Sequence, residues 1–190
     1  MPGTEWLLLL SQLPSSPSSV RVMVWRRMRA AGAVSLHNGV WALPSSPKSQ
    51  QIMGEIVSYV NAHGGSSSTF IARATGADME AGLLDAFAKN IGQDYAEFVD
   101  KCRDFRKEIE TEIGQKKLTF AELEENEAGL QKLTSWLRKI RARDYFGNEN
   151  AQDALNALDG CRSILRSFAR SVYTSEGMDV PDNEGEYSDE

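Results

Sequence analysis

The spacing of apolar residues predicts a strand and then a helix at the start of the chain. The run from Glu5 to Leu13 is short and apolar, and prolines follow it at once, which is typical of a buried strand. From Ser19 the apolar residues recur at helical intervals, and Gly32 is placed to end that helix. The buried stripe of this helix is expected to consist of Val20, Val24, Met28 and Ala31.

Two apolar runs around Asn38-Gly39 predict a β-hairpin. Asn-Gly favours the type I′ turn, in which both central residues have positive φ. After it, Ser46 predicts an N-cap with Pro47 in the first helical position, and residues 69–73 predict a short last strand. Strand, helix, two hairpin strands, helix and strand make the βαββαβ order of the ferredoxin-like fold.

After Gly76 the pattern becomes helical throughout. Apolar residues predict a short helix over 79–87 and a long one from Tyr95 to about Gly114. Thr119 with Glu122 forms a capping box for a further helix, and a last helix follows. Helices with short links and one apolar face each are expected to pack as an antiparallel bundle.

The pattern as a whole predicts an α+β protein in three parts. We expect a ferredoxin-like βαββαβ unit over residues 1–76, an antiparallel helical bundle over 77–174, and a disordered acidic tail over 175–190. The tail lacks the apolar residues that would offset the entropy lost on ordering it.

Composition and charge narrow the function classes. Two widely separated cysteines fit a reducing cytoplasm, and no stretch approaches the length of a membrane span, so we expect a cytoplasmic protein with no membrane partner. The net charge is −6, but residues 1–76 carry +4, residues 77–174 carry −3 and the tail carries −7. Because the tail holds the acidity, the average charge does not exclude a nucleic-acid partner.

Three segments resemble a known family. Trp6–Leu10, the helix with Arg21, Trp25 and Arg26, and the hairpin segment Gly32–Pro44 are similar to the N-terminal domain of the chromate-resistance regulator ChrB. The similarity continues through Arg143–Gly147 and covers about residues 5–173. It implies a transcriptional regulator that controls chromate-efflux genes and responds to chromate. Full-length members carry a second, C-terminal domain, whereas this sequence ends in an acidic tail, as in a short form or a paralogue.

The βαββαβ unit also resembles two other groups, the middle domain of the PaaX repressor and the small CRISPR-associated ferredoxin-like endonucleases. Those endonucleases place a metal-binding aspartate at the end of the first strand. Here the strand ends in Leu10–Leu13 without a carboxylate, so a nuclease is disfavoured.

The first candidate site is a basic helix. Its arginines suit contacts with DNA phosphates, each neutralised phosphate adding counterion release to the affinity. The alternative is a solvated face, or aliphatic stems that cover Trp25. The predicted DNA-binding residues are Arg21, Arg26, Arg27 and Arg29.

The second candidate site lies on the last two helices. Arginine forks suit a tetrahedral oxyanion such as chromate or sulfate. The alternative, that these side chains complement helix dipoles and form surface ion pairs, is the stronger interpretation from the sequence. The predicted oxyanion-binding residues are Arg138, Arg141, Arg162, Arg166 and Arg170.

The remaining reactive residue types assemble into no site. Three tryptophans, Trp6, Trp25 and Trp41, are expected in the core, and both cysteines are expected as packed thiols. His37 and His63 have no ligand-spaced partner, and no catalytic set or phosphate loop can be assembled. We therefore expect no catalytic residue, no metal and no cofactor.

The residues and the resemblance together indicate a chromate-responsive regulator that binds promoter DNA, and a homodimer is compatible with this. The alternative is an oxyanion-sensor or protein-interaction module that does not bind DNA. A steep salt dependence of promoter binding distinguishes the two.

Overall fold

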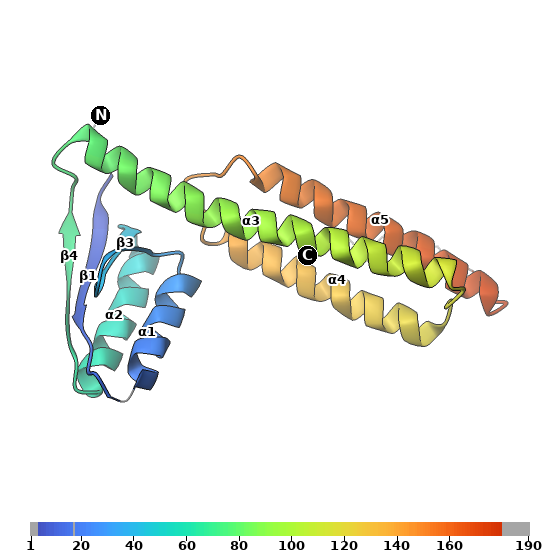
Figure 1. Cartoon of the computed structure of the whole chain (residues 1–190), viewed down its shortest axis with the longest axis horizontal. Coiled ribbons are helices and arrows are strands. Elements are labelled where there is room, and N and C mark those ends of the chain that lie inside the picture. The colour runs from blue at the N-terminus through green and yellow to red at the C-terminus, as the bar shows by residue number, and fades with distance from the viewer. Residues whose placement is uncertain (1–3, 17, 180–190) are drawn as a thin grey trace. The chain divides into compact units, whose positions relative to one another are not determined.

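The computed structural model describes residues 4–16 and 18–179 (Figure 1). It contains four strands and five helices, which confirms the α+β class. In chain order the elements are β1 (Trp6–Gln12), α1 (Ser18–Ala30), β2 (Val34–His37), β3 (Val40–Pro44), α2 (Pro47–Ala62), β4 (Ser66–Ala72), α3 (Ala77–Gly114), α4 (Phe120–Arg141) and α5 (Ala151–Ser175).

The strands form one antiparallel sheet in the order β2-β3-β1-β4, which is the ferredoxin-like arrangement. Figure 1 shows α1 and α2 on the same side of this sheet. Their apolar stripes pack with Leu7, Leu9 and Leu43 of the two central strands. The predicted stripe of α1 is confirmed, because Val20, Val24 and Met28 are each no more than 1% exposed.

The ends of the elements follow the predicted local signals. The Ser46 side chain accepts a hydrogen bond from the Ser49 amide, with Pro47 in the first turn of α2. Thr119 caps α4 in the same way, accepting from the Glu122 amide. Gly32, at φ +76°, ends α1, and the Ala33 amide donates to the Met28 carbonyl behind it.

The hairpin is present, but its turn differs from the predicted type. Gly39 has a φ of +77°, whereas Lys116 is the one non-glycine residue with positive φ in the described part of the chain, so Asn38 does not adopt it. The type I′ prediction is therefore wrong. Gly39 is required for another reason: a Cβ there would lie 2.2 Å from the Ser11 carbonyl oxygen. The close approach of β1 to the turn selects glycine.

Two elements are longer than predicted. The last strand begins at Ser66 rather than Thr69, because its serines pair with the end of β1. The two helices expected over 79–87 and from Tyr95 are one helix, α3. The apolar series that joins them includes Ile91, which is buried.

The chain divides into two compact units. The first contains residues up to Ile91 together with Arg143–Phe146, and the second contains Gly92–Ala142 and the residues from Gly147 onward. The ferredoxin-like unit thus includes the first part of α3 beyond residue 76. Most of the predicted tail, residues 180–190, lies outside the described residues.

In the second unit the helices run alternately up and down. Asn126 near the start of α4 donates to Glu112 near the end of α3 at 2.7 Å, and Figure 1 shows the two helices running side by side, so they are antiparallel. The centre of the Phe120 ring at the start of α4 lies 5.2 Å from the centre of the Tyr173 ring at the end of α5, so these two helices are antiparallel as well. The predicted antiparallel bundle is confirmed. Of the described helices, none combines the length and apolarity that a membrane crossing requires.

Candidate nucleic-acid interface

The basic face of α1 follows from its sequence periodicity. Val20, Val24 and Met28 recur every fourth residue and fill the core, so the residues between them project outward. The helix contains no acidic residue. All the predicted DNA-binding residues are exposed: Arg21, Arg26, Arg27 and Arg29.

Trp25 belongs to this surface and not to the core. Its side chain is 54% exposed, so the expectation that it is buried is wrong. The reason is angular: at about 100° per residue, Trp25 lies one step beyond Val24, away from the Val20–Met28 stripe. Trp6 is buried as expected, and Trp41 is half-buried.

The arginines of α1 do not all share one side of the helix. Arg21, Trp25 and Arg29 are spaced by four residues and lie along one flank. Arg27 lies on the other flank, with its guanidinium carbon 5.3 Å from the centre of the Tyr59 ring on α2. This cation–π contact ties Arg27 to the helix pair. The other three arginines of α1 make no such contact with a described ring.

A loop from the far end of the sequence supports the C-terminal end of α1. The Tyr145 hydroxyl donates to the Ala31 carbonyl at 2.7 Å, and burial raises the pKa of this phenol, which keeps it a donor. A Cβ on Gly32 would lie 2.8 Å from the Cβ of Arg143. The Phe87 ring contacts the rings of both Tyr145 and Trp6. These contacts, all within the first unit, hold the last turn of α1 in place.

Lys89 also lies on the basic surface, although the sequence pattern did not identify it as a candidate. It lines a groove of about 540 Å³ together with Arg29 and Trp25 of α1. Lys89 is exposed and comes from α3, one turn before the second unit begins. Its position depends on α3 being one continuous helix through this region rather than the two that were predicted.

The second arginine group is spread along α4 and α5. Arg162, Arg166 and Arg170 are separated by about 6 Å per step along the axis of α5. Arg138 and Arg141 are at the end of α4, beside the start of α5, because the two helices are antiparallel. The described structure therefore gathers these five residues into no single cluster.

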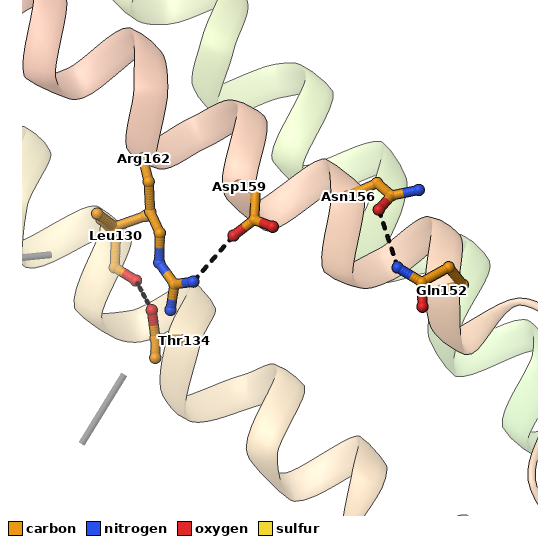
Figure 2. A network of polar contacts seen from close by, with 6 residues as sticks. All are labelled: Leu130, Thr134, Gln152, Asn156, Asp159 and Arg162. Carbon is orange, nitrogen blue, oxygen red and sulfur yellow. Dashed lines mark hydrogen bonds and ion pairs between the residues drawn. The ribbon is translucent and has the colours of Figure 1, made fainter. Parts of the chain in front are cut away.

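Arg162 already has protein partners. Its side chain is 14% exposed and its Nη1 donates to Asp159 Oδ1 at 3.0 Å. Figure 2 shows this side chain running from α5 toward α4, near Leu130 and Thr134. There the Thr134 hydroxyl donates a hydrogen bond to the Leu130 carbonyl oxygen. Arg166 and Arg170 are exposed. Arg170 borders a shallow pocket with the hydroxyl residues Ser171 and Thr174.

The two cysteines are packed thiols, as expected. Both are no more than 1% exposed, and Cys161 Sγ lies 3.4 Å from the Cys102 carbonyl oxygen, to which it donates. The contact with Cys161, together with burial, raises the pKa of the Cys102 thiol, which keeps it protonated. Within residues 4–16 and 18–179 no group of three or more histidine, cysteine or carboxylate side chains is placed to hold a metal ion.

The chemistry available on the first unit is therefore electrostatic and aromatic. Exposed guanidinium groups donate hydrogen bonds to anions in fixed fork geometry, and an exposed indole offers a flat apolar face. Such a surface suits binding of a polyanion that also presents planar groups.

Comparison with known proteins adds a family match. A family model described as "Protein ChrB, N-terminal" matches residues 21–178. A stretch of 46 residues, 24% of the chain, is 46% identical to "Protein ChrB" of Cupriavidus metallidurans. That stretch spans 14% of the relative's own length.

Proposed function

The chain belongs to the ChrB N-terminal family, and from that premise we propose that it is a cytoplasmic transcriptional regulator that binds DNA upstream of chromate-resistance genes and responds to chromate. It acts as a binding protein and not as an enzyme. The duplex is bound by the exposed face of α1. Arg21 and Arg26 contact phosphates, with Arg29 beside them at the end of the helix.

The observation that best supports this proposal is that arginines of α1 are exposed and that their positive charges are not balanced by ion pairs. In the part of the chain that the structure describes, none of Arg21, Arg26 and Arg29 takes part in an ion pair. Some cations of the bundle are paired instead: Lys101, Arg103 and Arg162 each form an ion pair with an aspartate on the same helix. Unpaired cations on one face supply the counterion release that drives binding to a polyanion.

The support around α1 fits the same role. Its buried stripe and the Tyr145–Ala31 hydrogen bond fix the helix, so its arginines are presented from a rigid element. Phosphate contacts of this kind set the position of a protein on the duplex and carry no sequence information themselves. Specificity for an operator therefore requires further contacts with base edges or DNA shape.

A gel shift on the DNA upstream of the native gene tests the proposal, with a scrambled duplex of equal length and with or without chromate. We expect retardation of the upstream fragment, weakening steeply between low and physiological salt, and a change in affinity on adding chromate. No retardation of either duplex at low salt would contradict DNA binding. Equal retardation of both would reduce the proposal to non-specific binding.

The second candidate function is an oxyanion sensor that does not bind DNA. It is favoured by Arg166 and Arg170, which are exposed on one face of α5 and form no ion pair within the described residues. Replacing both with glutamine should abolish chromate or sulfate binding measured by calorimetry. Replacing Arg138 and Arg141 with glutamine tests whether the oxyanion binds instead at the end of α4. Oxyanion binding without any promoter binding would favour this candidate over the first.

A further inference from the structure

The first unit contains a groove to which the proposed duplex contact assigns no ligand. It lies beside the last turn of α1, the edge strand β2 and the first part of α3. Its volume of about 540 Å³ falls within the range of small-molecule sites in proteins. The lining residues that matter here are Trp25, Arg29, Ser35, Trp41, Lys89 and Asn90.

The groove offers two indole surfaces. Trp25 is 54% exposed, while Trp41 on β3 is half-buried. An exposed tryptophan leaves a large apolar area in contact with water, which is unfavourable. A flat ligand that covers the indole recovers this free energy, and stacking of a nucleobase on an aromatic side chain is the common form of such a contact in proteins that bind nucleic acids.

The charge of the groove points to an anion. Arg29 and Lys89 line it from two different helices, and the lining residues include no carboxylate. Neither cation forms an ion pair among the residues that the structure describes. Asn90 is half-buried in the lining, and its amide both donates and accepts hydrogen bonds, as the edge of a base requires.

We propose that this groove binds a nucleotide, with the base stacked on Trp25 and the phosphate held by Arg29 and Lys89. A tetrahedral oxyanion alone would use the cations but would leave both indoles uncovered. A neutral aromatic molecule would use the indoles but would leave the cations unpaired. A nucleobase that carries a phosphate matches both halves of the lining. It can come from a free mononucleotide or from an unpaired nucleotide in a single DNA strand.

Isothermal titration calorimetry on the full chain tests the site with four probes. They are deoxyadenosine 5′-monophosphate, deoxyadenosine, inorganic phosphate and a tetranucleotide of deoxyadenosine. We expect saturable binding of the monophosphate or the tetranucleotide, weaker binding of deoxyadenosine, and no measurable binding of phosphate. Binding of the tetranucleotide alone would assign the site to a nucleotide within a strand, and equal binding of both would assign it to the free nucleotide.

Two variants separate stacking from charge. Trp25→Ala should weaken binding about 10-fold or more, from the usual effect of removing a stacked aromatic side chain. Lys89→Gln should weaken binding of the monophosphate about 5-fold and leave deoxyadenosine unaffected, because it removes only a charged contact. The matched controls are Phe70→Ala, which removes a side chain 53% exposed on β4, and Lys48→Gln, which removes an exposed cation outside the groove.

The outcome is independent of duplex binding. No saturable binding of any nucleotide probe would overturn the proposal, and so would equal losses in Trp25→Ala and Phe70→Ala or in Lys89→Gln and Lys48→Gln. Folding of each variant is checked by circular dichroism. If Trp25→Ala does not fold, the comparison of Lys89→Gln with Lys48→Gln still tests the site. Arg21 and Arg26 do not line the groove, so duplex binding through them can fail or succeed without changing this result.

Discussion

The hydroxyl of Tyr145 donates a hydrogen bond to the carbonyl oxygen of Ala31 across 114 residues of sequence, at 2.7 Å. It joins the loop between α4 and α5 to the end of α1. Gly32 lies next to this bond and contacts Arg143. Two of the segments that carry the family resemblance, Gly32–Pro44 and Arg143–Gly147, are therefore in contact with each other in the folded unit.

Removal of the Tyr145 hydroxyl tests this relationship. Tyr145→Phe keeps the ring against Phe87 but leaves the carbonyl of the buried Ala31 unsatisfied, so the free energy of unfolding should fall by about 1–2 kcal/mol. Chemical denaturation monitored by circular dichroism measures the change. Tyr59→Phe is the control, because no hydrogen bond to the Tyr59 hydroxyl exists among the described residues. Equal effects of the two variants would show that the Tyr145–Ala31 bond contributes nothing.

Glycine-to-alanine substitutions at two positions should change the stability of the protein in opposite directions. Gly32→Ala places a Cβ 2.8 Å from Arg143 Cβ at a φ of +76°, and should cost about 1–3 kcal/mol. Gly54→Ala lies within α2, where no atom comes within 4 Å of the added Cβ, and should stabilise the protein by about 0.5–1 kcal/mol. Thermal unfolding compares the two. A neutral or stabilising Gly32→Ala would contradict the description of the α1 terminus.

Most of the fold could be predicted from the sequence because its signals are local. The stripe of α1, the caps at Ser46 and Thr119, and the position of the hairpin depend on neighbouring residues only. The continuity of α3 could also have been predicted, since Ile91 continues the apolar series between Phe87 and Tyr95. The close approach of the Ser11 carbonyl to Gly39 could not, because Ser11 is distant from the turn in the sequence.

The two thiols should be unreactive in the native protein. Cys102 and Cys161 are buried, and the pKa of Cys102 is raised by its contact with Cys161 and by burial. With Ellman's reagent at neutral pH we expect no rapid release of product until guanidinium unfolds the chain, when both thiols should react. Rapid reaction of either thiol without denaturant would mean that the second unit opens around α3 and α5.

Glu112 should give stability a distinctive pH dependence. Burial raises the pKa of its carboxyl group, opposed by the hydrogen bond that it accepts from Asn126. A carboxyl group whose folded pKa is above its unfolded value costs stability when ionised, and this cost disappears as the pH falls below the unfolded value, near 4.5. Glu112→Gln, which can still accept from Asn126, should therefore be more stable than the parent at pH 7 and equal to it near pH 4.

Denaturant unfolding of both proteins over this pH range measures the difference. Glu110→Gln is the matched control, since it removes an exposed negative charge from the same helix. The role given to Glu112 would be wrong if its variant gained no stability at pH 7, or if the gain persisted unchanged at pH 4.

The candidate site was less predictable than the fold. The arginines of α1 could be identified from sequence, and the angle between Trp25 and the Val24 stripe could have placed that indole outward. Lys89 could not be assigned to the same surface, because only the path of α3 past the edge strand brings it to Trp25 and Arg29. Nothing in the spacing of Arg162, Arg166 and Arg170 revealed that Asp159 already pairs with the first of them.

The slope of log affinity against log salt tests the central claim, that α1 binds duplex DNA, most directly. Fluorescence anisotropy with the labelled upstream duplex compares the parent with Arg21→Gln/Arg26→Gln, which should reduce the magnitude of the slope by about 1.8, or 0.9 for each phosphate that is no longer neutralised. The control Lys101→Gln/Arg103→Gln removes the same charge from α3, where both cations pair with aspartates, and should leave the slope unchanged. An unchanged slope in the α1 variant, or an equal reduction in the control, with both variants folded, would contradict the assignment of α1 to the DNA interface.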